Sequence, residues 1–234
     1  MKPPEPHVIK PVKLADGVWS LPVDERDHSV AIEFRDHVIV VEAPDSESLS
    51  APAIDVIKKL IPGKPIKYVI NTHTHFDHAG GLRTYAAEGA TIVTQRDNIS
   101  YYEQVWAYPR TINPDRLAKS GQKPVFEGVT GNRIFSDGSR QVIVYHYAGN
   151  MHNAGMLMVY LPKERILIEA DSYNPPANAN TPPAGLPNLV HFVDAVERLR
   201  LDVDQVVPIH DQPATFDTVR RAVATYKDSQ LSFR

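Results

Sequence analysis

The chain of 234 residues is long enough for one large α/β domain, and its 42% hydrophobic and 23% charged residues are typical of a folded globular protein. The formal net charge of −3 argues against a nucleic-acid partner, because binding to phosphates calls for a basic face. No apolar run approaches the ~18–20 residues that a membrane-spanning helix needs, so we expect no membrane partner either.

The absence of cysteine restricts the chemistry of any metal site. With no cysteine in the sequence, disulfides and thiolate ligands are excluded, and a transition metal must be held by His, Asp, Glu, water or a backbone oxygen. Residues 1–6 lack the apolar stretch of a secretion signal. The compartment stays open: cytoplasmic, or periplasmic if a leader was removed.

Residues 1–13 are rich in proline and are expected to form an extended lead-in to a single domain over residues 14–234. Alternation at Val30, Ile32 and Phe34 predicts a half-buried strand, whereas the apolar run at 38–41 predicts a strand covered on both faces. The elements expected in this half of the chain are strands at 30–34 and 38–41, a helix at 50–60, a strand at 68–70, a helix at 82–88 and a strand at 91–94.

Residues 95–130 are less regular, and regular patterns return after them. The later elements expected are strands at 141–147, 156–161 and 165–170, a loop at 174–187, a helix at 189–201, a strand at 205–209 and a helix at 215–227. Strand pairs and single strands that alternate with helices indicate a layered α/β fold.

A cluster of potential metal ligands follows the apolar residues 68–70. Three histidines and one aspartate fall within six residues, namely His73, His75, Asp77 and His78. In an extended segment, residues two apart point the same way, so His73, His75 and Asp77 can converge. His78 must point elsewhere unless the chain turns, as Gly80-Gly81 and a following helix would allow. The spacing therefore suits two neighbouring metals, and ligands without thiolate are consistent with zinc, iron or manganese.

Three further candidates each follow an apolar run: His152, Asp171 and His210. Ligands gather beyond the carboxyl ends of strands in open α/β sheets, so these positions can share one rim. Each also has a structural alternative, His152 and His210 as loop residues and Asp171 as a helix or turn cap.

These residues resemble the motifs of the metallo-β-lactamase superfamily. The first motif of that family, HxHxDH, matches residues 73–78, and its later His, Asp and His match His152, Asp171 and His210. The resemblance covers the chain from about Asp16 onward. It implies a four-layer αβ/βα sandwich with mixed sheets and a metal-dependent hydrolase with two zinc ions along one edge.

The resemblance also implies a role for each ligand. His73, His75 and His152 would hold the first zinc, Asp77, His78 and His210 the second, and Asp171 would bridge the two. A bridging aspartate in a chain without cysteine looks like the glyoxalase II, lactonase and phosphodiesterase branches. Ala170 and Asp211 depart from the family, since many relatives have glycine at both positions.

Two close divalent metals lower the pKa of a shared water, which supplies a hydroxide nucleophile at neutral pH. Two Zn²⁺ against Asp77, Asp171 and hydroxide leave a site charge of about +1, which favours an anionic substrate or transition state. Asp77 is the candidate catalytic residue, since it can orient the hydroxide as well as bind metal. The bond cleaved in the small-molecule substrate, an ester, thioester, lactone, phosphoester or amide, is left open.

Trp106 and Tyr173 are the candidate substrate-binding residues. Trp106 belongs to an aromatic cluster with Tyr101, Tyr102 and Tyr108 that either forms a wall over the metals or packs a helix against the fold. Tyr173 lies two residues after Asp171 and either donates a hydrogen bond to a developing oxyanion or packs beneath Pro175-Pro176.

The main alternatives are an iron-dependent oxidoreductase of the same fold and a β-lactamase proper. A flavo-diiron protein would need an added flavodoxin domain, and a mononuclear dioxygenase would not need the second set of ligands. A nuclease and a non-catalytic binding protein are disfavoured, the first by the lack of a basic stripe and the second by the complete ligand sets. Oligomeric state is not readable from the sequence.

Overall fold

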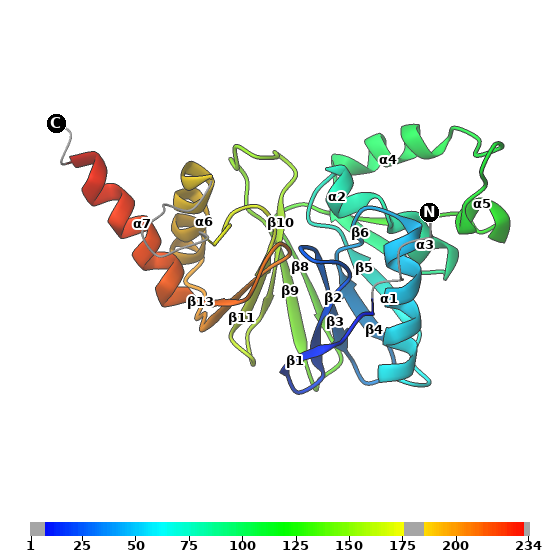
Figure 1. Ribbon diagram of the computed structural model, residues 1–234, viewed down its shortest axis with the longest axis horizontal. Helices are drawn as coiled ribbons and strands as arrows, with labels where there is room; N and C mark the ends of the chain where they lie inside the picture. The colour runs from blue at the N-terminus through cyan, green and yellow to red at the C-terminus, as the bar shows by residue number, and fades with distance from the viewer. Residues whose placement is uncertain (1–7, 176–184, 232–234) are drawn as a thin grey trace, which may run out of the picture. The chain divides into compact units, whose positions relative to one another are not determined.

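The computed structural model of the chain describes residues 8–175 and 185–231, and its elements are labelled in Figure 1. The chain divides into two compact units, Met1–Gly128 (unit 1) and Val129–Arg234 (unit 2). Each unit contains a mixed β-sheet with helices, which confirms the predicted mixed α/β class. The prediction of one domain over residues 14–234 is not tested by this division.

Unit 1 holds a seven-stranded sheet in which the strands lie in the order of the chain. The strands are β1 (Val12–Ala15), β2 (Val18–Pro22), β3 (His28–Glu33), β4 (Val38–Val41), β5 (Ile66–Ile70), β6 (Thr91–Gln95) and β7 (Val125–Val129). Pairing is antiparallel from β1 to β4 and parallel from β4 to β6. Five of the six residues of β3 are buried, so the prediction of a half-buried strand is wrong. The central β3 is covered on both faces.

The helices of unit 1 are α1 (Glu47–Leu60), α2 (Phe76–Ala79), α3 (Leu82–Ala87), α4 (Asn98–Trp106) and α5 (Arg116–Ser120). Helices α1 and α3 lie side by side, as Figure 1 shows. Residues 95–130 are more regular than the sequence indicates, since they contain α4, α5 and β7. Only Asn98 and Tyr102 are buried in α4, so its apolar periodicity is too weak to mark a helix.

Unit 2 holds a six-stranded sheet in the order β13-β12-β11-β10-β9-β8. Its elements are β8 (Asn132–Ser136), β9 (Gln141–His146), β10 (Leu157–Leu161), β11 (Ile166–Glu169), α6 (Leu186–Arg198), β12 (Gln205–Pro208), β13 (Ala214–Thr215) and α7 (Phe216–Leu231). Strand β8 is an addition to the elements expected from the sequence. The expected loop at 174–187 lies partly outside the described residues.

Parallel pairing brings the candidate ligands of each unit to a sheet edge. In unit 1, β4 runs parallel to β5, so the segments after Val41 and Ile70 leave the sheet at the same end. In unit 2, β11 runs parallel to β12, with Glu169 opposite Pro208, so the segments that carry Asp171 and His210 also leave together.

Among the described residues, no helix is both long and apolar enough to cross a membrane.

Candidate metal centre

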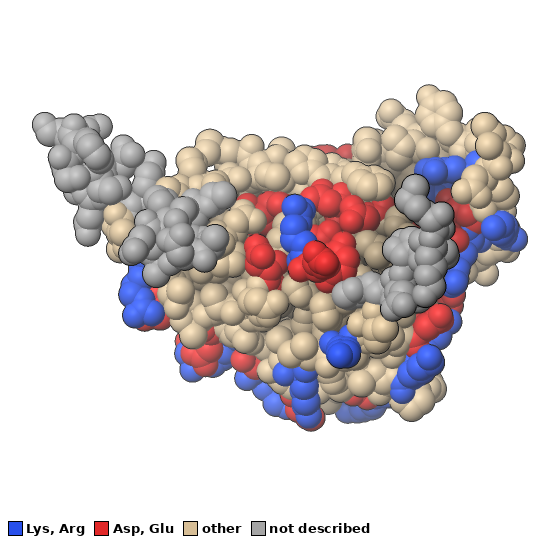
Figure 2. Space-filling view, viewed as in Figure 1, with Lys and Arg blue, Asp and Glu red and all other residues tan. Residues whose placement is uncertain are grey.

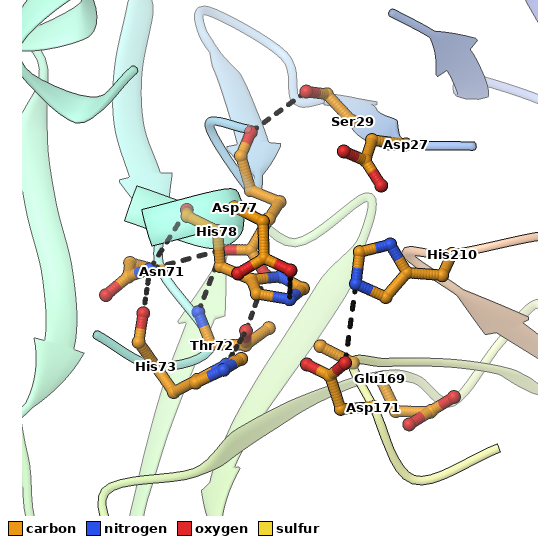
Figure 3. A network of polar contacts seen from close by, with 12 residues as sticks. Asp27, Ser29, Asn71, Thr72, His73, Asp77, His78, Glu169, Asp171 and His210 are labelled. Atoms are coloured by element: carbon orange, nitrogen blue, oxygen red, sulfur yellow. Dashed lines mark hydrogen bonds and ion pairs between the residues drawn. The ribbon is translucent and has the colours of Figure 1, made fainter. Parts of the chain in front are cut away.

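The HxHxDH motif occupies the segment that joins β5 to α2. The ring centroid of His73 lies 4.5 Å from that of His75 and 4.3 Å from that of His78. Helix α2 begins at Phe76 and turns the chain, which is the turn that the motif needs for His78 to lie beside His73. His73 and His78 are buried, Asp77 is half-buried and His75 is exposed. The imidazoles of the motif thus range from buried to exposed. Figure 3 shows the buried pair His73 and His78 with Asp77.

Asp77 lies close to both its neighbour His78 and a cation. Its Oδ2 is 3.6 Å from Nε2 of His78 and 3.2 Å from Nη2 of Arg26, which belongs to the segment between β2 and β3. Arg26 also contacts Asp27 at 3.2 Å. The Arg26 guanidinium therefore competes with any metal for Asp77, and it places a positive charge at the rim of the site.

Acidic side chains gather near Asp77. Asp77 lines a hollow in unit 1 together with Asp24, Glu25, Arg26, Asp27 and Asp45. Figure 2 shows acidic side chains around a basic one on the face in view. Burial, with the charges of Asp27 and Asp24, raises the pKa of Asp45. This part of unit 1 attracts cations.

Glu42 is not predicted as a site residue from the sequence, yet its side chain contacts residues in and next to the motif. Glu42 is fully buried and follows β4, with a left-handed φ of 73°. Its carboxylate accepts hydrogen bonds from the Thr72 backbone N–H (3.1 Å), the Thr72 hydroxyl and Asn71 Nδ2 (3.2 Å), and it lies 3.1 Å from Nδ1 of His78. A carboxylate on one ring nitrogen orients a histidine and leaves the other nitrogen for a metal. A charged residue directly after an apolar run was the available sequence signal.

Asn71 ties the two ends of the motif together. Its Nδ2 donates to the backbone oxygens of His73 (2.6 Å) and His78 (3.2 Å), as Figure 3 shows. Its Oδ1 accepts a hydrogen bond from the Tyr102 hydroxyl. These hydrogen bonds fix the backbone around His73 and His78. A buried amide that lost them would be left without a hydrogen-bond partner, which is unfavourable.

In unit 2, the two oxygens of Asp171 face two different histidines. Oδ2 lies 3.5 Å from Nε2 of His152. Oδ1 lies 3.4 Å from Nε2 of His210, a contact that Figure 3 shows. Asp171 has a left-handed φ of 58°, an uncommon conformation for a residue other than glycine and one that is often found at functional sites. The His152 backbone N–H donates to Asn150 Oδ1 at 2.8 Å, which fixes the loop that carries it.

These distances suit ligands that share a metal. Hydrogen bonds between N and O cluster near 2.9 Å, whereas two ligand atoms about 2.1 Å from one tetrahedral metal are separated by roughly 3.4 Å. Three imidazole–carboxylate pairs have N–O distances close to that value. They are His210–Asp171 (3.4 Å), His152–Asp171 (3.5 Å) and His78–Asp77 (3.6 Å). The donors are imidazole and carboxylate throughout, so the residues present fit a divalent metal such as zinc.

A second buried carboxylate holds the turn that contains Asp171. Glu169 accepts the backbone N–H of Ser172 (2.9 Å) and of Tyr173 (3.3 Å), and burial raises the pKa of its carboxyl to about 8. Tyr173 is only 3% exposed, and burial raises the pKa of its phenol. This burial favours a packing role for Tyr173 over contact with a substrate. The predicted packing beneath Pro175-Pro176 is not described in full, because Pro176 lies outside the described residues.

Each unit thus brings together part of the predicted ligand set. Unit 1 carries His73, His75, Asp77 and His78, and unit 2 carries His152, Asp171 and His210. Of the two predicted substrate residues, Trp106 is half-buried on α4 and Tyr173 is buried. Asp211, where many relatives of the resembled family have glycine, has a φ of 69°, a conformation that glycine adopts without strain.

Two curated proteins are similar to this chain at low sequence identity. The chain is 27% identical over 197 residues to 2,4-dinitroanisole O-demethylase subunit alpha of Nocardioides sp. (strain JS1661), a match that covers 82% of this chain and 55% of the relative. It is 28% identical over 131 residues to a type 2 metallo-β-lactamase of Elizabethkingia meningoseptica, covering 56% of this chain and 46% of the relative. The matches span about half the length of these relatives.

Solved structures show the same fold. A metallo-β-lactamase from Pontibacter korlensis aligns with a TM-score of 0.70 at 18% identity, over 93% of this chain and 98% of that one. The metallo-β-lactamase FIM-1 of Pseudomonas aeruginosa, in a mono-zinc form, aligns with a TM-score of 0.69 at 18% identity, over 97% and 98%. The family model of the metallo-β-lactamase superfamily matches residues 28–210. The chain therefore belongs to the metallo-β-lactamase superfamily.

Proposed function

We propose that this chain is a zinc-dependent hydrolase with two metal ions, which cleaves an ester, thioester, lactone, phosphoester or amide-type bond in a small molecule. His73, His75 and His152 would hold one zinc, and Asp77, His78 and His210 the other. Asp171 would bridge them. The proposal rests on the position of the Asp171 carboxylate. One of its oxygens faces His152 and the other faces His210, one histidine from each proposed ligand set.

When bound, two such metals lower the pKa of a shared water so that a nucleophile exists at neutral pH. The chain's own residues then hold the geometry. Glu42 fixes His78 through Nδ1, and Asn71 fixes the backbone of the motif. Asp77 accepts a hydrogen bond from the attacking nucleophile and orients it, in addition to its role as a ligand. Arg26, 3.2 Å from Asp77, donates a hydrogen bond to that carboxylate and holds it at the rim of the site.

Metal analysis combined with activity on a substrate panel tests this proposal. Protein purified without chelator should hold up to two zinc ions per chain. His75→Ala should lose metal and activity together, because His75 is an exposed candidate ligand of the first zinc. His146→Ala is the matched control, since His146 lies outside the proposed ligand set and its Nε2 is 2.9 Å from the backbone oxygen of Ala154. Full activity after exhaustive chelation would end the hypothesis of metal catalysis.

The panel should include bonds that represent each branch of the family: a thioester, a lactone, a β-lactam, a phosphoester and a simple ester. An aryl methyl ether is added because one relative, over 82% of this chain, is named an O-demethylase of 2,4-dinitroanisole. Zinc is colourless, so a coloured protein that contains iron would favour the oxidoreductase alternative instead.

A further inference from the structure

Unit 1 contains a cavity of about 380 Å³ beside the HxHxDH motif. We call it the α4 pocket; its walls include Thr74, Phe76, Arg83, Tyr101, Trp106 and Asp115. Thr74 and Phe76 flank the candidate ligand His75 in the sequence. Asp45 also lines the pocket, and the same Asp45 lines the hollow that contains Asp77. Through Asp45, the pocket therefore adjoins the hollow that contains the candidate ligand Asp77.

The charged residues in the wall are Asp45, Glu47, Arg83, Arg110 and Asp115, and two of them, Arg83 and Asp115, pair with each other. Arg83 contacts both carboxylate oxygens of Asp115, and its guanidinium lies 5.4 Å from the centroid of the Trp106 ring. Asp115 also accepts the Ala118 backbone N–H at 2.9 Å. The hydrogen bond from Arg83 lowers the pKa of Asp115, so the pair stays ionised at neutral pH. These charges hold α3 and α5 in place and offer little to a charged ligand.

Four aromatic side chains, Phe76, Tyr101, Tyr102 and Trp106, also line the pocket, and part of this aromatic wall faces solvent. Phe76 is 71% exposed and Tyr101 is 48% exposed, while Trp106 is half-buried. Large apolar side chains beside a cavity expose surface that a ligand would cover with a gain in free energy. A cavity of ~150 Å³ already holds benzene, so the α4 pocket has room for a substituted ring.

We propose that the α4 pocket binds an uncharged aromatic ring of the substrate. The ring would lie against Trp106 and Phe76, and the bond to be cleaved would extend past Asp45 toward Asp77. This inference rests on the proposed function for the reaction, but ring binding itself needs no metal. It names the substrate class as small molecules in which an aryl group is attached to the hydrolysed bond.

Intrinsic fluorescence tests ring binding directly. The chain has two tryptophans, Trp19 and Trp106. Titration of the full chain with 4-nitrobenzyl alcohol, a neutral nitroaromatic quencher, should give saturable quenching, both as purified and after chelation. Trp19→Phe should keep the saturable component and Trp106→Phe should lose it. Absence of saturable quenching in the wild type, or its persistence in Trp106→Phe, would overturn the proposal.

A pair of variants on α4 tests the location by an independent measurement. Val105 lines the pocket, whereas its neighbour Gln104 is exposed. Val105→Phe should fill the pocket and raise the dissociation constant of the probe at least tenfold, and Gln104→Phe should change it less than twofold. Circular dichroism checks that both variants fold; if Val105→Phe does not, Val105→Leu replaces it. Equal dissociation constants for the folded variants would overturn the assignment.

Ring binding in the α4 pocket and hydrolysis at the metal centre can be tested separately. Hydrolysis of panel substrates without saturable probe binding would leave the hydrolase standing and remove the aryl pocket. Saturable probe binding in a protein that hydrolyses no bond of the panel would keep the pocket and remove the reaction. If both hold, an aryl ester should have a KM at least tenfold lower than the corresponding methyl ester, and Val105→Phe should erase that difference.

Discussion

The carboxylate of Glu42 lies 3.1 Å from Nδ1 of His78, and both side chains are fully buried. The two residues are 36 positions apart in the sequence and meet because β4 and β5 run parallel. A buried carboxylate that faces a histidine fixes its ring orientation and raises the basicity of the opposite nitrogen. Glu42 is therefore a positioning residue for the candidate metal ligand His78.

Glu42→Gln should lower zinc affinity about 10–100-fold, the usual effect of the loss of an outer carboxylate partner. The amide keeps the shape of the side chain but removes the negative charge beside His78. Competition with a chelating dye measures the affinity. Glu33→Gln is the matched control, because Glu33 pairs with Lys64 away from the motif. Equal zinc affinity in Glu42→Gln and the wild type would show that the Glu42 carboxylate has no influence on metal binding.

Asp171→Ala should reduce metal content and turnover by more than the ~100-fold that the loss of an outer partner costs. Asp171 faces both His152 and His210, so its loss removes a ligand from both proposed metals. Asp211→Ala should have a much smaller effect, since Asp211 is exposed. Asp211→Gly should keep both metal and activity, because glycine accepts the φ of 69° at that position. Similar losses from Asp171→Ala and Asp211→Ala would mean that the bridging carboxylate is misassigned.

Tyr173→Phe should leave turnover within about twofold of the wild type, because the phenol is buried and not open to a substrate. The substitution keeps the ring and removes only the hydroxyl. Turnover on the best panel substrate, together with metal content and melting temperature, measures the effect. A fall in turnover of about tenfold or more, with the other two quantities unchanged, would instead assign Tyr173 the oxyanion role.

Asp115→Asn should destabilise the protein at pH 7 by about 1–2 kcal/mol, because Asp115 pairs with Arg83 and caps α5. The pKa of Asp115 is lower in the folded state than the ordinary value of 3.8. The carboxylate therefore contributes stability that is present above pH 3.8 and is lost as the pH falls through the lower folded pKa. The free energies of unfolding of wild type and variant should begin to converge below pH 3.8 and become equal only below the lowered folded pKa of Asp115.

Urea unfolding from pH 7 down to about pH 2 measures this convergence. Asp217→Asn is the control, because Asp217 pairs with Arg221 at the surface of α7, where an ion pair contributes about 0.5 kcal/mol or less. A difference between wild type and Asp115→Asn that does not depend on pH would show that the ion pair with Arg83 contributes no stability.

The sequence by itself determined the family, the mixed α/β class and the order of most elements. Local patterns carry this information: apolar runs mark the buried strands, and four potential ligands stand within six residues of one another at His73, His75, Asp77 and His78. Relations over a few residues depend on backbone geometry alone, so spacing is enough to predict them.

Only the tertiary structure decided which distant residues meet. It placed Glu42 against His78, turned the two oxygens of Asp171 toward different histidines and left an aromatic cavity beside α4. It also covered both faces of β3 and formed α4 from a segment with weak periodicity. These outcomes depend on packing and hydrogen bonding between segments far apart in the chain, and the free energy of such contacts is not encoded in local spacing.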